Sequence, residues 1–184
     1  VTLPRELFTE LILINDLRAH GPSPETTQSA SLILDRLDSF IPDAWSATQP
    51  SFQDDWRLLS SIFHAAMSLY AILSLQSSGA LSASSPELAL AQARHARRLF
   101  ALLEPGMEAP KVKKRMLWPL VVAGVEAARA SREVQAYIGQ RLREMSRDQG
   151  CATPLVGKQV LERFWALGGG TWDDCFEEPV ALVL

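Results

Sequence analysis

Apolar side chains recur every three or four residues along most of this chain, a spacing typical of α-helices with one buried face. The longest such segment begins at Ser51 and runs to about residue 76, with two adjacent apolar stripes and only a narrow polar seam. A helix that is apolar over most of its circumference is covered by several neighbours. The pattern therefore predicts a long central helix around residues 51–76.

Six further helices are predicted from the same spacing, with caps, prolines and glycines at their ends. Their ranges are 2–20, 24–40, 88–103, 111–129, 131–145 and 153–167. In the first of them, Phe8, Ile12 and Leu13 widen the apolar face, so we expect much of that helix to be buried. In the fourth, Pro119 lies in the interior and predicts a bend, because proline removes a backbone hydrogen bond.

Seven helices without a convincing strand predict an all-α fold. Short loops favour antiparallel neighbours, so we expect an irregular helical bundle or array. A repeat period near 34 or 40 residues is not found, which argues against a solenoid. Residues 43–50 are predicted to form a loop, and the Ser/Gly-rich residues 76–85 a mobile linker or inter-helix loop. At 184 residues the chain is expected to be one domain, residues 1–184.

Composition excludes several functions. The net charge is −3 and the pI is about 5.6, whereas a module that grips phosphates is usually basic, so direct contact with nucleic acid is not expected. Cys151 and Cys175 are too few for a zinc cluster and fit a reducing compartment. One disulfide between them is the alternative.

We also expect neither a signal peptide nor a membrane span in this sequence. The first residues contain Glu6, Glu10 and Asp16 and do not resemble a signal peptide. The longest apolar stretch, Met116–Val125, is too short to span a bilayer. The chain begins with Val1 and not with Met, so we expect a piece of a longer protein.

Candidate catalytic and metal-binding groups are isolated. Asp173-Asp174 with Glu177-Glu178 resembles the acidic box that holds magnesium in helical terpene synthases, but a second metal motif on a facing helix is lacking, so a solvated helix end is favoured. His64 lies on the polar seam of the long helix without matching ligands, which favours a structural role. Glu126 is expected to pair with an arginine or a neighbouring helix, because an unpaired buried charge is costly.

Six aromatic and methionine side chains on different predicted helices can be interpreted in two ways. Ordinary core packing is the first interpretation of these residues, and a lipophilic ligand pocket between helices is the alternative. The candidate pocket residues are Phe63, Met67, Met116, Trp118, Phe164 and Trp165.

Several motifs follow one another between Arg115 and about Phe176. Trp118-Pro119 is followed by Val122-Ala-Gly-Val-Glu126, then by an aromatic-Ile helix at Tyr137-Ile138, and then by Phe164-Trp165 and Trp172. In these motifs the segment resembles a known family, the fungal-specific transcription factor domain. Arg132 only roughly fills the place of an arginine that the family has after the Ala-Gly-x-Glu segment. These motifs are typical of packing positions, so they indicate membership better than they indicate a site.

The resemblance implies the regulatory region of a nuclear regulator, which acts in the nucleus or moves between nucleus and cytoplasm. A zinc cluster would bind DNA outside this chain, so a cofactor is not expected here. The expected partners are co-regulator proteins, a second copy of the chain, or a sterol or other lipophilic metabolite. Membrane binding and enzyme activity are not expected, and a helical enzyme acting on a lipophilic substrate is the alternative. The sequence does not decide between activation and repression.

Overall fold

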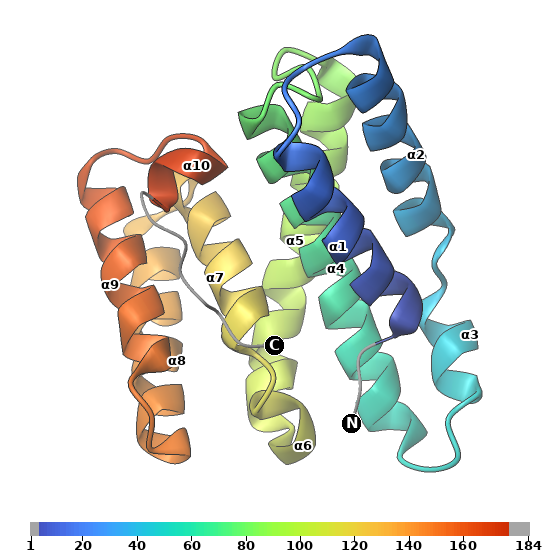
Figure 1. Ribbon diagram of the computed structural model, residues 1–184. Helices are drawn as coiled ribbons and strands as arrows, with labels where there is room; N and C mark the ends of the chain where they lie inside the picture. The colour runs from blue at the N-terminus through green and yellow to red at the C-terminus, as the bar shows by residue number, and fades with distance from the viewer. Residues whose placement is uncertain (1–3, 177–184) are drawn as a thin grey trace. The chain divides into compact units, whose positions relative to one another are not determined.

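The computed structural model describes residues 4–176, and these residues form ten α-helices and one short 3-10 helix (Figure 1). The seven longest helices have ten or more residues each, in agreement with the predicted number and with the all-α fold. The helices are α1 (Arg5–Arg18), α2 (Pro24–Ser39), α3 (Pro42–Ala47), α4 (Gln53–Ser77), α5 (Pro86–Glu108), α6 (Pro110–Lys113), α7 (Leu117–Glu126), η1 (Ala127–Arg129), α8 (Arg132–Gln149), α9 (Thr153–Ala166) and α10 (Trp172–Cys175).

Contacts group these helices into two compact units, residues 1–99 and 100–184. The first unit contains α1 to α4 and the first part of α5, and the second contains the rest of α5 and all later helices. The prediction of a single domain over residues 1–184 stays a prediction.

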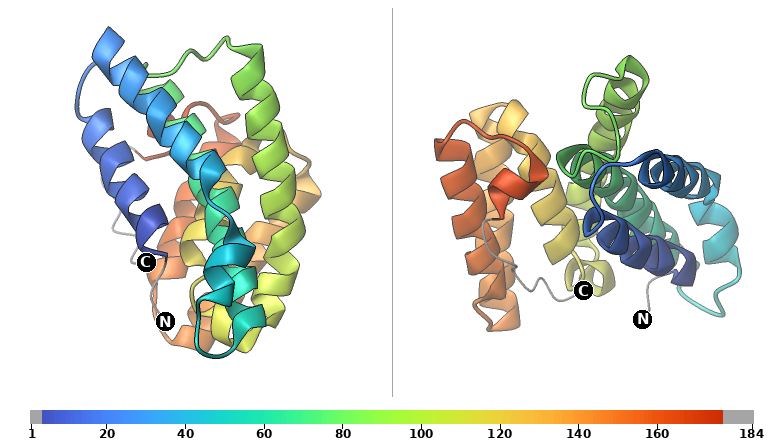
Figure 2. Two further views of the ribbon diagram at one scale, coloured as in Figure 1. Left: turned by 90° about the vertical axis from the view of Figure 1, so that its right-hand side faces the viewer. Right: turned by 45° about the horizontal axis from the view of Figure 1, so that its top comes forward.

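The long helix α4 is the centre of the first unit. All residues from Ile62 to Leu75 are buried, and α1, α2 and α3 pack against this helix. Figure 2 shows α2 running beside α1 in both views. The predicted central helix around residues 51–76 is thereby confirmed. Among the described residues α4 is also the one helix long and apolar enough to cross a membrane, but 89% of that window is buried within the protein, as in the core helix of a globular protein.

We predicted that much of α1 is buried, and this is wrong for one face of the helix. Leu7, Leu11, Ile14 and Leu17 face the core, whereas Phe8, Ile12 and Leu13 are exposed, Ile12 by 54%. The helix packs on α2 and α4 through one face only, so the residues that widen its apolar stripe remain on the surface.

The predicted loop at residues 43–50 is also wrong, because Pro42–Ala47 form α3. Pro42 stands in the first turn, where its missing N–H is not needed. A helix of six residues is too short to show a period. Tertiary contacts hold it: the rings of Trp45 and Trp56 meet edge to face at 5.6 Å, and the Ser60 hydroxyl donates to the Pro42 carbonyl at 3.4 Å.

Two predicted effects of proline differ from the structure. The helix expected to end near residue 103 continues to Glu108 with Pro105 inside it, supported by the buried Leu103 and Met107. The helix expected at 111–129 is broken between Lys113 and Leu117, so Pro119 is the third residue of α7. At that position the backbone N–H has no acceptor within the helix, and Pro119 therefore does not produce a bend there.

The second unit is organised around α7, in which all residues from Leu117 to Val125 are buried. Both α8 and α9 pack against α7 and against each other. Gly150 ends α8 in the left-handed conformation, at φ 64°, which glycine adopts without strain.

The segment at residues 76–85 starts with a hydrogen-bonded turn. Gly79 has φ 79°, the Leu81 N–H donates to the Leu75 carbonyl at 3.0 Å, and Ala80 and Leu81 are buried. The beginning of this segment is therefore part of the first unit. The predicted mobility of the segment stays a prediction.

Candidate functional site

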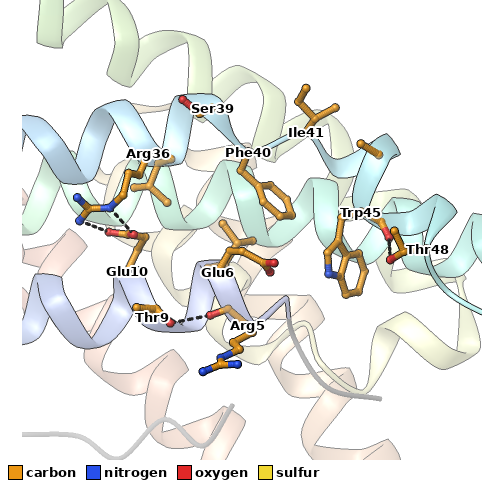
Figure 3. A pocket seen from close by; sticks show the side chains of 13 residues that line it. Arg5, Glu6, Thr9, Glu10, Arg36, Ser39, Phe40, Ile41, Trp45 and Thr48 are labelled. Carbon is orange, nitrogen blue, oxygen red and sulfur yellow. Dashed lines mark hydrogen bonds and ion pairs between the residues drawn. The ribbon is translucent and has the colours of Figure 1, made fainter.

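An open groove of about 770 Å³ lies on the first unit, where α1, the end of α2 and α3 meet (Figure 3). Its walls combine apolar side chains with a few charged and hydroxyl groups. The lining residues are Arg5, Glu6, Leu7, Thr9, Glu10, Arg36, Leu37, Ser39, Phe40, Ile41, Ala44, Trp45 and Thr48.

The course of the chain from α2 to α3 makes one wall of this groove. Phe40 and Ile41 are extended, with ψ 125° and 102°, and Pro42 then starts α3. Phe40 and Trp45 therefore come from either side of a sharp change of direction and line the same groove. Ile41 is 61% exposed at its edge.

A buried histidine fixes the end of α2 from behind. The Nε2–H of His64 on α4 donates to the Leu37 carbonyl at 2.8 Å, and the ring of Phe40 lies 5.6 Å from the His64 ring. Leu37 and Phe40 both line the groove, so His64 is a positioning residue for its floor. This agrees with the structural role predicted for His64.

A second histidine lies next to the first. The rings of His64 and His95 meet edge to face at 6.1 Å, although about 30 positions of sequence separate them. His95 Nε2 lies 3.7 Å from Asp38 and accepts from Arg94 at 3.3 Å. Burial lowers the pKa of His64, against the opposing effect of its hydrogen bond to Leu37. Burial, helped by Arg94, lowers the pKa of His95 to about 4, so both rings are neutral at pH 7.

One end of the groove is closed by an ion pair. Arg36 donates from Nε and from a terminal nitrogen to the two carboxylate oxygens of Glu10, at 2.7 and 2.8 Å. The Glu10 side chain is only 9% exposed, and a carboxylate so buried requires such a partner. The hydrogen bond to Glu10 raises the pKa of Arg36.

Glu6, unlike Glu10, is a groove carboxylate without an ion pair among residues 4–176. Its side chain reaches into the middle of the groove, towards Phe40 and Trp45 (Figure 3). The groove therefore contains one carboxylate that is neutralised, Glu10, and one that is not.

The charged side chains of the groove balance in number. Its lining contains Arg5 and Arg36 against Glu6 and Glu10. The whole segment 5–47, which contains α1 to α3, has seven acidic and three basic side chains, a net charge of −4.

The six residues predicted to line a lipophilic pocket are divided between the two units. Phe63 and Met67 lie in the core of the first, whereas Met116, Trp118 and Phe164 are buried in the second. Trp165, also in the second unit, is partly exposed. The groove is lined by none of the six. The lipophilic pocket built from them stays a prediction. The sequence signal for the groove was the run from Phe40 to Trp45, which the prediction divided between the end of a helix and a loop beginning at residue 43.

The motif that suggested the family has a packing role in the second unit. A Cβ on Gly124 would lie 2.8 Å from Leu161 Cδ2 and closer still to Cδ1, so α9 approaches α7 at a point where only glycine fits. The indole N–H of Trp165 donates to the Gly124 carbonyl at 2.8 Å. Glu126 lies 3.7 Å from Arg129, the arginine pairing expected for it.

The acidic cluster is a helix start. The Thr171 hydroxyl and backbone N–H each donate to the Asp174 carboxylate at 2.7 Å, and these bonds lower the pKa of Asp174. This is the solvated helix end that the sequence favoured, while Glu177 and Glu178 lie outside the described residues. Within residues 4–176, groups of three or more side chains suited to a metal ion are not found.

Comparison with known proteins gives one family. The family described as fungal specific transcription factor domain matches residues 7–180. The chain belongs to this family. It is a family of transcription factor domains and not of enzymes, which agrees with the expectation that the chain is not an enzyme.

One curated relative has a described function. The chain is 34% identical over 185 residues to the phomenoic acid biosynthesis cluster-specific transcriptional regulator of Leptosphaeria maculans. The match covers 96% of this chain but 35% of that protein, so the chain spans about a third of the length of this relative. Similarity to a solved structure is not found.

The family match is longer than the resemblance found in the sequence, which covered only Arg115 to about Phe176. The family match extends over both units and includes the groove residues from Leu7 to Thr48, whereas Arg5 and Glu6 precede it. The chain is thus a regulatory domain of a fungal transcription factor.

Proposed function

We propose that this domain controls transcription by binding a protein partner, such as a co-regulator, in the groove between α1, α2 and α3. The observation that carries this proposal is the combination of apolar groups, Phe40, Ile41 and Trp45, with the carboxylate of Glu6, which has no ion pair among residues 4–176. Exposed apolar surface with a polar rim is typical of a binding site.

In this proposal the whole protein acts in the nucleus, and a zinc-cluster region outside this chain contacts DNA. The curated relative is a regulator specific to a biosynthesis cluster, and this supports regulation of a biosynthesis gene cluster by the present protein as well.

A tethering experiment tests the proposal without knowledge of the target genes. The 184-residue chain is fused to a DNA-binding domain of known specificity, and reporter transcription is measured. Ala44→Trp places an indole in the groove, whereas Ala47→Trp places one on the same helix outside its lining; both positions are exposed. We expect Ala44→Trp to abolish the effect on the reporter and Ala47→Trp to leave it unchanged. Equal behaviour of the two variants, or a wild-type fusion without effect, would contradict the proposal.

A lipophilic metabolite is the second candidate occupant. The groove volume of about 770 Å³ lies within the range of about 300–1,000 Å³ typical of small-molecule sites. Native mass spectrometry of the purified chain, followed by organic extraction, tests this candidate. One lipophilic compound per chain, displaced in Ala44→Trp but not in Ala47→Trp, would favour metabolite sensing over a protein partner. The same spectrum tests the homodimer expected from the sequence.

A further inference from the structure

The chemistry of the groove restricts what kind of protein segment it accepts. Among residues 4–176 the structure contains no strand, so an added β-strand would find no sheet edge there to pair with. The walls of the groove are helices, and an amphipathic helix laid into an apolar groove is the binding mode that uses such walls.

Charge then selects among amphipathic helices. Glu10 is neutralised by Arg36 through two hydrogen bonds, so it has little attraction left for a ligand. Glu6 has no ion pair within residues 4–176 and lies towards the aromatic rings of Phe40 and Trp45 (Figure 3). A carboxylate next to aromatic faces fits a lysine or arginine side chain, because the cation is attracted both by the carboxylate and by the rings.

We propose that the groove binds a basic amphipathic helix of a partner protein, whose apolar side chains contact Phe40, Ile41 and Trp45 and whose lysine or arginine pairs with Glu6. This inference rests on the proposed function, because the groove is the same one. It adds the charge of the partner and the residue that recognises it.

Fluorescence anisotropy with two labelled peptides tests the inference. One is an amphipathic peptide of leucine and lysine, about four helical turns long, and the other has glutamate in place of every lysine. The chain is expected to bind the leucine–lysine peptide, more weakly as salt is raised, and not to bind the leucine–glutamate peptide. Glu6→Gln should weaken binding of the leucine–lysine peptide about tenfold, the loss typical of a charge-assisted hydrogen bond.

The matched control is Asp35→Asn. Asp35 is exposed on α2 and does not line the groove, so this variant removes the same amount of charge from the same part of the protein. Its binding should remain within about twofold of wild type. Equal loss in both variants would show a general attraction to an acidic surface and would overturn the inference, as would equal binding of the two peptides.

Failure of the inference and failure of the proposed function are distinguishable. If Ala44→Trp abolishes the reporter effect but Glu6→Gln changes neither peptide binding nor the reporter, the groove functions without charge recognition. If Ala44→Trp leaves the reporter unchanged, the groove itself is not the functional site. Thermal unfolding of each variant, expected to match wild type, checks that the fold is intact.

Discussion

His64 on α4 donates a hydrogen bond from Nε2 to the carbonyl oxygen of Leu37, 2.8 Å away, at the end of α2. This bond joins the central helix of the first unit to the last turn before the chain changes direction. Because Leu37 and Phe40 line the groove, a side chain outside the groove lining determines where its floor lies.

Replacing His64 by alanine is expected to lower the free energy of unfolding by about 2–3 kcal/mol, because a buried hydrogen bond and the contact with Phe40 are both lost. Urea denaturation measures the change. His20→Ala is the control: His20 is exposed, so its loss should cost less than about 0.5 kcal/mol. Equal effects would contradict the positioning role of His64.

The buried ring of His95 makes stability depend on pH. Its pKa is about 4 in the folded chain, against 6.5 for an unperturbed histidine, so between these limits the unfolded chain binds more protons. Stability due to this group is complete above pH 6.5 and is lost as the pH falls towards 4. Lowering the pH from about 7 to about 5 should cost about 2 kcal/mol from His95 alone.

His64 contributes with the same sign, because its pKa is also lowered. The charged groups that face the pair are Asp38, which favours protonation of both rings, and Arg94 and Arg98, which oppose it. Urea denaturation at neutral pH and near pH 5 should show a smaller loss for His95→Gln than for wild type. An identical loss in the two proteins would show that His95 does not titrate as its burial indicates.

The two cysteines should differ in reactivity. Cys151 is exposed, whereas Cys175 is buried and burial raises its pKa to about 12. The thiolate is the reactive form, so one thiol per chain should react rapidly with Ellman's reagent and the second only after denaturation. Cys151→Ser should abolish the rapid phase. Two thiols reacting at one rate, or none reacting in the absence of reductant, would contradict the free thiols of the structure.

Periodicity was sufficient to predict the long helices because each has a continuous buried face. The predicted central helix matches α4, and its apolar stripes correspond to its contacts with α1, α2 and α3. Short elements such as α3 could not be predicted in this way. Contacts with distant residues stabilise them, as Trp45 is held by Trp56, and no local pattern records such contacts.

The groove was missed for a related reason. Glu6 and Trp45 come from separate elements, and their proximity depends on how α1 and α3 pack on α4. The pairing of His64 with His95 was missed likewise, because they come from α4 and α5 and no local pattern shows that these two side chains meet. The prolines were misinterpreted because the effect of a proline depends on its place in the helix: Pro119 lies in a first turn and Pro105 within α5.

The family motif was correctly interpreted as packing, and Gly124 shows its physical basis. Leu161 is fully buried on α9, and its branched end occupies the space where a side chain at position 124 would begin. Leu161 therefore has little room to move away.

Gly124→Ala is expected to destabilise the chain by about 1–3 kcal/mol through overpacking, although alanine favours helix. Gly139→Ala in α8 is the matched control: the nearest atom to its new Cβ is Lys158 Cε at 3.8 Å, so the same change there should stabilise by about 0.5–1 kcal/mol. Urea denaturation measures both. Combining Gly124→Ala with Leu161→Ala should cost less than the sum of the two single changes, because the second removes the atoms that clash. Additive costs, or a stabilising Gly124→Ala, would show that the contact between α7 and α9 does not require glycine.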